Sequence, residues 1–242
     1  MHDLENAAIS SWPALEEERH RGWILRFSRG YTGRANSVNA TPESEPLHGE
    51  DLAAIEARYR GRGLPPLFRL ADFSAPAGLD AKLEARGYEF RDRSLVMTLA
   101  AAAFPESAAA SREFGDAAAW LEFFQSVSGK RGSDQAMHLE LMGRIAPPRL
   151  LLVREAAGRA ASCGLGVVAN GWLGLFDIAT AVDQRRQGHG RALCLDLLAR
   201  GRALGAHGAY LQVLASNASA IALYEAMGFR TAYAYWYRQA AD

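Results

Sequence analysis

A turn that contains arginine and glycine, Arg185-x-x-Gly188-x-Gly190, follows an apolar run and opens a helical segment. A helix that begins at such a turn presents unpaired backbone N–H groups and its positive end to one point, which suits a pyrophosphate. Glycine serves there because a side chain would keep the ligand's oxygens away from the main chain. By itself the pattern is weak, since a glycine turn between strand and helix is often only a turn. The residues predicted to bind phosphate are Arg185, Arg186, Gln187, Gly188, His189, Gly190 and Arg191.

The segments after the turn strengthen this interpretation. Apolar residues at helical spacing predict a helix over residues 190–204, residues 209–214 predict a buried strand, and residues 218–227 predict a second helix. Asn217 and Tyr224 are seven residues apart, about two helical turns, so their side chains leave the same face of that helix. Taken alone, Tyr224 would be explained better as an ordinary core aromatic.

Three segments together resemble the GCN5-related N-acetyltransferase (GNAT) family. They are residues 178–190, which end in the glycine turn, residues 217–224, and Gly228-Phe229. Their order and spacing match the family, so the match is highly specific. The resemblance implies the GNAT fold, an α/β (α+β) arrangement in which helices flank a mixed, mostly antiparallel twisted sheet. It also implies transfer of an acetyl group from acetyl-CoA, without a metal, to a primary amine.

The same resemblance assigns roles to individual residues. Backbone groups of Ile178, Ala179 and Thr180 would pair with the pantetheine arm of acetyl-CoA. Asn217 and Tyr224 would also bind the cofactor, and Tyr224 would act as general acid to the departing thiolate. A phenol with an ordinary pKa near ~10 is protonated at neutral pH, which suits this role. The amine can attack the thioester directly in a ternary complex, so no covalent enzyme intermediate is required.

The general base is less well determined. Asp177 is the carboxylate nearest in sequence to residues 178–180, and we keep it as a candidate. The alternative is that Asp177 is a solvated carboxylate at the end of a strand. In the family, the base varies in position and is sometimes only water.

Composition limits the compartment and the partners. The 242 residues are 49% hydrophobic and carry no net charge, so no strong field draws the chain to nucleic acid or to an anionic membrane. We expect a cytoplasmic monomer or homodimer that acts on a small-molecule or peptide amine. Cys163 and Cys194 lie in apolar segments and form no disulfide pattern, and the six histidines lack paired metal spacing. Neither a leader-like segment nor an apolar run near ~18 residues is present.

The chain divides into two halves at a stretch rich in small residues, 100–112. We predict an N-terminal domain over 1–103 and a catalytic GNAT domain over 112–242. The second half is predicted to contain two helices and three strands before the glycine turn. These helices cover residues 116–127 and 134–145, and the strands cover residues 150–154, 160–169 and 172–180.

The first half resembles a degenerate copy of the second. A strand over residues 67–70, a helix over 78–86 and a strand over 95–99 repeat the order strand, helix, glycine, strand. Aligning Gly87 with Gly228 places Pro76 on Asn217 and Leu83 on Tyr224, so the cofactor amide and the acid are both absent. We therefore expect one cofactor per chain, in the C-terminal half. An unrelated α/β cap is the alternative.

Residues 23–31 and 34–39 predict two strands around a glycine turn, dense in aromatic and polar groups. They could line the acceptor site, in which case Arg34 or Asn36 would affect the acceptor KM, or they could simply build the first half's own sheet. A second function class also stays open, a non-catalytic acyl-CoA sensor or partner-binding module. A nucleotide-binding oxidoreductase is weaker, because its fingerprint needs another glycine spacing.

Overall fold

The computed structural model describes residues 1–106, 111–129 and 134–241. Its α-helices are α1 (His2–Ser11), α2 (Gly49–Arg60), α3 (Leu79–Ala85), α4 (Ala117–Ser128), α5 (Gln135–Gly143), α6 (His189–Ala203) and α7 (Ala218–Ala226). Its strands are β1 (Glu16–His20), β2 (Trp23–Phe27), β3 (Val38–Asn39), β4 (Leu67–Ala71), β5 (Tyr88–Ala100), β6 (Arg112–Glu113), β7 (Arg149–Ala156), β8 (Arg159–Ala169), β9 (Trp172–Thr180), β10 (Gly208–Leu214) and β11 (Arg230–Ala240). Short 3₁₀ turns are η1 (Gly33–Ala35), η2 (Ala101–Ala103) and η3 (Val182–Gln184).

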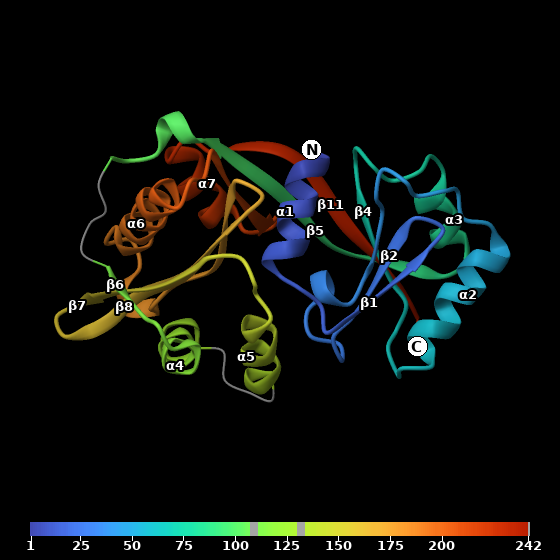
Figure 1. Cartoon of the computed structure of the whole chain (residues 1–242), viewed down its shortest axis with the longest axis horizontal. Coiled ribbons are helices and arrows are strands. Elements are labelled where there is room, and N and C mark those ends of the chain that lie inside the picture. The colour runs from blue at the N-terminus through green and yellow to red at the C-terminus, as the bar shows by residue number, and fades with distance from the viewer. Residues whose placement is uncertain (107–110, 130–133, 242) are drawn as a thin grey trace.

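All these strands belong to one sheet, in the order β1-β2-β3-β4-β11-β5-β10-β9-β8-β7-β6. The pairs β3–β4 and β9–β10 are parallel, and every other pair in the described ranges is antiparallel. The long strands β5 and β11 run side by side through the middle of the molecule (Figure 1). The last strand, β11, lies between β4 and β5, so strands from the two ends of the chain interleave.

The two ends of the sheet follow the same plan. The segments β3–α2–β4 and β9–α6–β10 each join a parallel strand pair through a helix. A second helix then leads to a long strand that pairs with the opposite end of the sheet: α3 precedes β5, which pairs with β10, and α7 precedes β11, which pairs with β4. The strand order is therefore symmetric about the β5–β11 pair, apart from the short edge strand β6.

Helices cover both faces of the sheet at the C-terminal end. On one face, α6 and α7 contribute Leu193, Leu197 and Tyr224 to a core that also contains Phe229. On the other face, α1, α4 and α5 form a core with Trp12, Trp120 and Phe176 among its members. At the N-terminal end, α2 and α3 pack on the sheet around Ile55, Phe68 and Leu83. The first helix, α1, lies over the middle of the molecule (Figure 1) and contacts β8 and β9.

The predicted mixed, mostly antiparallel sheet flanked by helices is confirmed. A separate second domain is not seen, because the sheet runs unbroken from β1 to β6. The division into 1–103 and 112–242 stays a prediction, and residues 107–110 of the predicted linker lie outside the described residues. Phe104, just before them, is buried rather than solvated.

The prediction of a strand over residues 34–39 was wrong for its first part. Residues 33–35 form the turn η1, and only Val38–Asn39 is a strand. The reason is local. The Arg26 guanidinium donates to the Arg34 carbonyl at 2.8 Å, and the Asn36 side chain accepts from the backbone N–H of Ser28 at 2.6 Å. Side chains thus replace the ladder bonds that a strand would need.

The predicted burial of the two cysteines is confirmed, and both thiols are free. Burial raises the pKa of the Cys194 thiol to about 12, so it is an inert apolar group at neutral pH. None of the helices in the described part of the chain is long and apolar enough to cross a membrane. Within the same residues, no cluster of three His, Cys, Asp or Glu side chains is arranged to hold a metal ion.

Candidate active site

The sheet splits between β9 and β10. The two strands pair only from Trp172 to Leu175 on β9, after which β9 continues along β8 and β10 continues along β5. Residues 178–180 therefore have a strand neighbour on one edge only. Just before them, Asp177 has a φ of +49° and the register against β8 shifts, so β9 is bulged where the split opens. The open edge gives a ligand access to backbone hydrogen-bonding groups.

A cavity of about 670 Å³ occupies this split, and most of its wall is on the α6–α7 face of the sheet. It brings together most of the residues predicted for the cofactor, and only Gln187 among them does not line it. Asp177, the candidate general base, does not line the cavity either. Ser128, at the end of α4, lines the cavity as well and was not predicted. The predicted residues in the wall are Ile178, Ala179, Thr180, Arg185, Arg186, Gly188, His189, Gly190, Arg191, Asn217 and Tyr224.

The start of α6 faces this cavity with unpaired donors. The first backbone N–H in the helix with an internal partner is that of Ala192, which donates to the Gly188 carbonyl at 2.9 Å. The N–H groups of residues 187–191 donate to no other residue in the described ranges. Gly188 caps the helix with a φ of +84°, and a Cβ there would meet nothing within 4 Å. Its backbone conformation, rather than crowding, thus favours glycine.

Asn217 has a structural role at the start of α7. Its Oδ1 accepts from the Ala220 N–H at 3.2 Å and from the Ser219 hydroxyl at 3.1 Å, which caps the helix. The side-chain NH₂ makes no hydrogen bond to another described residue. The cap fixes the amide at the cavity wall and leaves its donor group available to a ligand.

Tyr224 combines burial with an unused hydroxyl. Its side chain is 7% exposed and its ring meets Phe229 edge to face, with ring centroids 5.8 Å apart. Within the described residues, its hydroxyl has no hydrogen-bond partner. Burial, with a smaller contribution from Cys194, raises the pKa of Tyr224 well above its ordinary value. The cavity therefore holds a phenol that stays protonated at neutral pH.

Asp177 points to the opposite face of the sheet. Its Oδ2 lies 3.1 Å from Nε2 of His138 on α5, and Nδ1 of the same imidazole lies 2.8 Å from the Tyr31 hydroxyl. The contact between Nδ1 and the Tyr31 hydroxyl is a hydrogen bond, whereas Nε2 and the Asp177 carboxylate are close without meeting hydrogen-bond geometry. We call these three residues the Asp177–His138–Tyr31 chain. Burial and the negative charge of Asp177 raise the pKa of Tyr31 to about 12, so its hydroxyl keeps its proton.

Two members of this chain were missed from the sequence. His138 lies in the predicted helix over 134–145, and Tyr31 lies 107 residues before it in the N-terminal half. Neither spacing nor composition relates two such distant residues. The pairing depends on how α5 and the turn after β2 meet, which is a tertiary property.

Comparisons with known proteins agree with this geometry. A family model described as "Probable histone acetyltransferase Rv0428c C-terminal" matches residues 1–238. The "Uncharacterized N-acetyltransferase YobR" of Bacillus subtilis is 27% identical over 241 residues, covering 97% of this chain and 96% of the relative. The "Probable histone acetyltransferase Rv0428c" of Mycobacterium tuberculosis is 27% identical over 230 residues, covering 94% of this chain and 70% of the relative.

A solved structure is also similar along the whole chain. It is that of a GCN5-related N-acetyltransferase from Kribbella flavida, with a TM-score of 0.74 and 14% sequence identity. The match covers 100% of this chain and 95% of the other. At that identity, the likeness shows a common fold.

Proposed function

The chain belongs to the GNAT family of N-acetyltransferases, and from this premise we propose that it moves the acetyl group of acetyl-CoA directly to a primary amine in a ternary complex. The observation that supports this most is the cavity at the β9–β10 split, whose wall contains both a helix start with free N–H groups and a protonated phenol. The first feature suits a pyrophosphate and the second suits a leaving thiolate.

The donor would lie along the cavity from α6 to the split. Free N–H groups of residues 187–191 and the exposed side chains of Arg185, Arg186 and Arg191 would hold the pyrophosphate. Backbone groups on the open edge of residues 178–180 would pair with the pantetheine arm. These contacts would place the thioester where β9 and β10 diverge.

The proposed reaction forms one bond and breaks one. The amine nitrogen bonds to the thioester carbon, the carbon–sulfur bond breaks, and Tyr224 gives its proton to the thiolate. A backbone N–H on β9 would stabilise the charge that builds on the carbonyl oxygen. The amine loses a proton to the Asp177 carboxylate, and solvent exchange resets both groups.

The Asp177–His138–Tyr31 chain supports Asp177 as the base. These three side chains lie on the face of the sheet opposite Tyr224. Acid and base would therefore approach the thioester from two sides of the split. One carboxylate oxygen faces His138, and the side chain remains 18% exposed. His138 would help to orient the carboxylate through this close contact, and Tyr31 would orient the imidazole through its hydrogen bond, which makes both of them positioning residues.

We also propose that residues 1–103 form a degenerate GNAT-like half and 112–242 the catalytic half. The symmetric strand order supports this, since α2 occupies the place of α6. The start of α2, however, is occupied by its own carboxylate: the Asp51 side chain accepts from the His48 N–H at 2.9 Å. A phosphate would meet that negative charge. Leu83 is buried at the position aligned with Tyr224.

Thiol release from acetyl-CoA over a panel of amines tests the proposed function, with acetyl-CoA binding measured in parallel by calorimetry. We expect binding and amine-dependent release, with Asp177→Asn lowering kcat and leaving acetyl-CoA affinity unchanged. Binding without release for any amine would favour the sensor function. Failure to bind acetyl-CoA would refute the proposal altogether.

A further inference from the structure

A second cavity, of about 380 Å³, lies on the Asp177 face of the sheet, between the N-terminal strands and the end of β10. Its wall includes Arg34 from η1, Gln212 from β10, and Tyr235 and Tyr237 from β11. The two tyrosines belong to the core that contains Phe176, whereas the proposed donor cavity borders the other core. The two cavities are thus on opposite faces of the sheet, and the β9–β10 split lies between these faces.

Arg34 in this wall has no carboxylate partner within the described residues. Its guanidinium carbon lies 5.6 Å from the centroid of the Trp12 ring and 5.3 Å from that of Phe176. Two neighbouring arginines are matched, Arg26 with Glu17 at 3.0 Å and Arg69 with Glu5 at 2.6 Å. Aromatic faces attract the Arg34 cation without using its N–H donors, so the charge is held in place and remains available.

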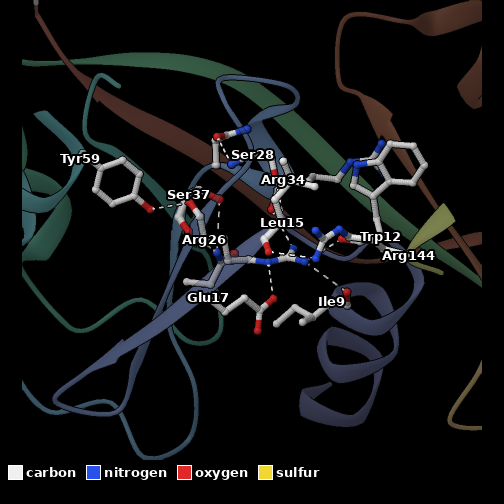
Figure 2. Close-up of polar contacts among 12 residues, drawn as sticks. Ile9, Trp12, Leu15, Glu17, Arg26, Ser28, Arg34, Ser37, Tyr59 and Arg144 are labelled. Atoms are coloured by element: carbon white, nitrogen blue, oxygen red, sulfur yellow. Dashed lines mark hydrogen bonds and ion pairs between the residues drawn. The ribbon is translucent and has the colours of Figure 1, made fainter. Parts of the chain in front are cut away.

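The backbone around Arg34 is fixed by Arg26, as Figure 2 shows. The Arg26 guanidinium donates to the Arg34 carbonyl at 2.8 Å and to the Trp12 carbonyl at 2.7 Å. The Trp12 indole in turn donates to the Thr32 hydroxyl at 3.2 Å. One buried arginine thus ties the end of α1 to the turn that bears Arg34. A pre-organised cation of this kind loses little conformational entropy when it binds a ligand.

We propose that this cavity takes the acceptor, and that the acceptor is a small amine with a carboxylate close to its nitrogen, such as a free α-amino acid. This inference rests on the proposed acetyl transfer. A guanidinium pairs with a carboxylate through two parallel N–H bonds. Phe176, which Arg34 contacts, directly precedes Asp177, so a carboxylate bound to Arg34 would lie beside the strand segment that carries the proposed base. The cavity volume is near the lower end of the range for small-ligand sites.

The test compares amino acids with their carboxamides as acceptors in thiol release from acetyl-CoA. We expect the carboxylate forms to be preferred, and Arg34→Gln to raise their KM about 10- to 100-fold, the range for lost charge-assisted hydrogen bonds. The KM for acetyl-CoA and the rates with carboxamides should not change. Arg34→Lys should recover part of the preference, because it keeps the charge without the planar fork.

Arg112→Gln is the matched control. Arg112 also lies over an aromatic ring, that of Phe114 at 4.2 Å, but on the far edge strand β6 and 60% exposed. It should leave the preference for carboxylates intact. If Arg34→Gln lowers only the melting temperature and keeps that preference, Arg34 is a packing residue and the inference is wrong.

A direct binding measurement separates this inference from the proposed function. The same amine pairs are titrated calorimetrically into protein saturated with CoA. Carboxylate-dependent binding that Arg34→Gln abolishes would support the acceptor site even if no transfer occurred. Equal or absent binding of both members of every pair would overturn it, whatever the outcome of the acetyl-CoA experiment.

Discussion

The substitution Tyr224→Phe isolates the proposed general acid from the packing of its ring. The change removes one hydroxyl and leaves the contact with Phe229. Because that hydroxyl has no hydrogen-bond partner in the described residues, its loss breaks no internal bond. Removing an unpaired buried polar group is neutral or slightly stabilising, so the free energy of unfolding should change by less than about 0.5 kcal/mol.

The kinetic effect should be far larger. General-acid catalysis contributes about 10²- to 10⁴-fold in rate, which at 1.36 kcal/mol per tenfold is about 2.7 to 5.4 kcal/mol of transition-state stabilisation. The loss should fall on kcat, with the affinity for acetyl-CoA unchanged. Since burial raises the pKa of Tyr224, its ionisation should not reduce kcat of the wild type below about pH 10.

Tyr59→Phe is the matched control, because this phenol is also buried but lies in the N-terminal core. Its hydroxyl donates to the Arg26 carbonyl at 3.1 Å. Losing that bond should cost about 1 to 3 kcal/mol of unfolding free energy, measured in urea, with kcat intact. The two variants should therefore show opposite patterns. A Tyr224→Phe enzyme that keeps more than about a tenth of wild-type kcat would refute the general-acid role.

Three further predictions concern stability and the donor site. Glu5→Gln should lower the free energy of unfolding by about 3–5 kcal/mol in urea, because it leaves the buried Arg69 charge without its carboxylate partner; a change under 1 kcal/mol contradicts this. Gly188→Ala should lower the free energy of unfolding by about 1–2 kcal/mol, because an alanine is strained at the Gly188 φ of +84°. It should also weaken acetyl-CoA binding measured by calorimetry. Burial raises the pKa of Tyr59 and Tyr88, so these two phenols should not make the free energy of unfolding depend on pH below about pH 10. Above that pH the free energy of unfolding should fall, because the unfolded chain loses these protons first. Urea midpoints that stay level up to pH 11 would contradict the last prediction.

Local elements could be predicted closely from the sequence. The helix over 190–204 and the strand over 209–214 match α6 and β10 to within a residue, because apolar periodicity and a glycine stop define them. That most of the predicted cofactor residues would lie together could also be predicted, because the wall of their cavity comes almost entirely from residues 178–224.

Elements that depend on distant partners could not be predicted in the same way. The strand β5 was predicted only from Leu95, where a short apolar run begins, yet it starts at Tyr88. Its first part is mostly exposed and is held by pairing with β11, in which Tyr88 faces Ala240. No local pattern indicates that the last strand enters between β4 and β5. The His138 contact with Tyr31 is hidden for the same reason.

The placement of β11 would let the N-terminal half contribute to the proposed reaction, whose donor that half would not bind. This strand directly follows the helix that bears Tyr224, and it presents Tyr235 and Tyr237 to the second cavity while pairing with β4. From the N-terminal half, Tyr31 reaches the Asp177 chain and Arg34 reaches the same cavity. The half whose own helix start is occupied by a carboxylate would thus form the opposite wall of the proposed site. Substitutions in residues 31–34 should consequently alter acceptor kinetics and leave acetyl-CoA affinity unchanged, a division of labour that two independent domains would not require.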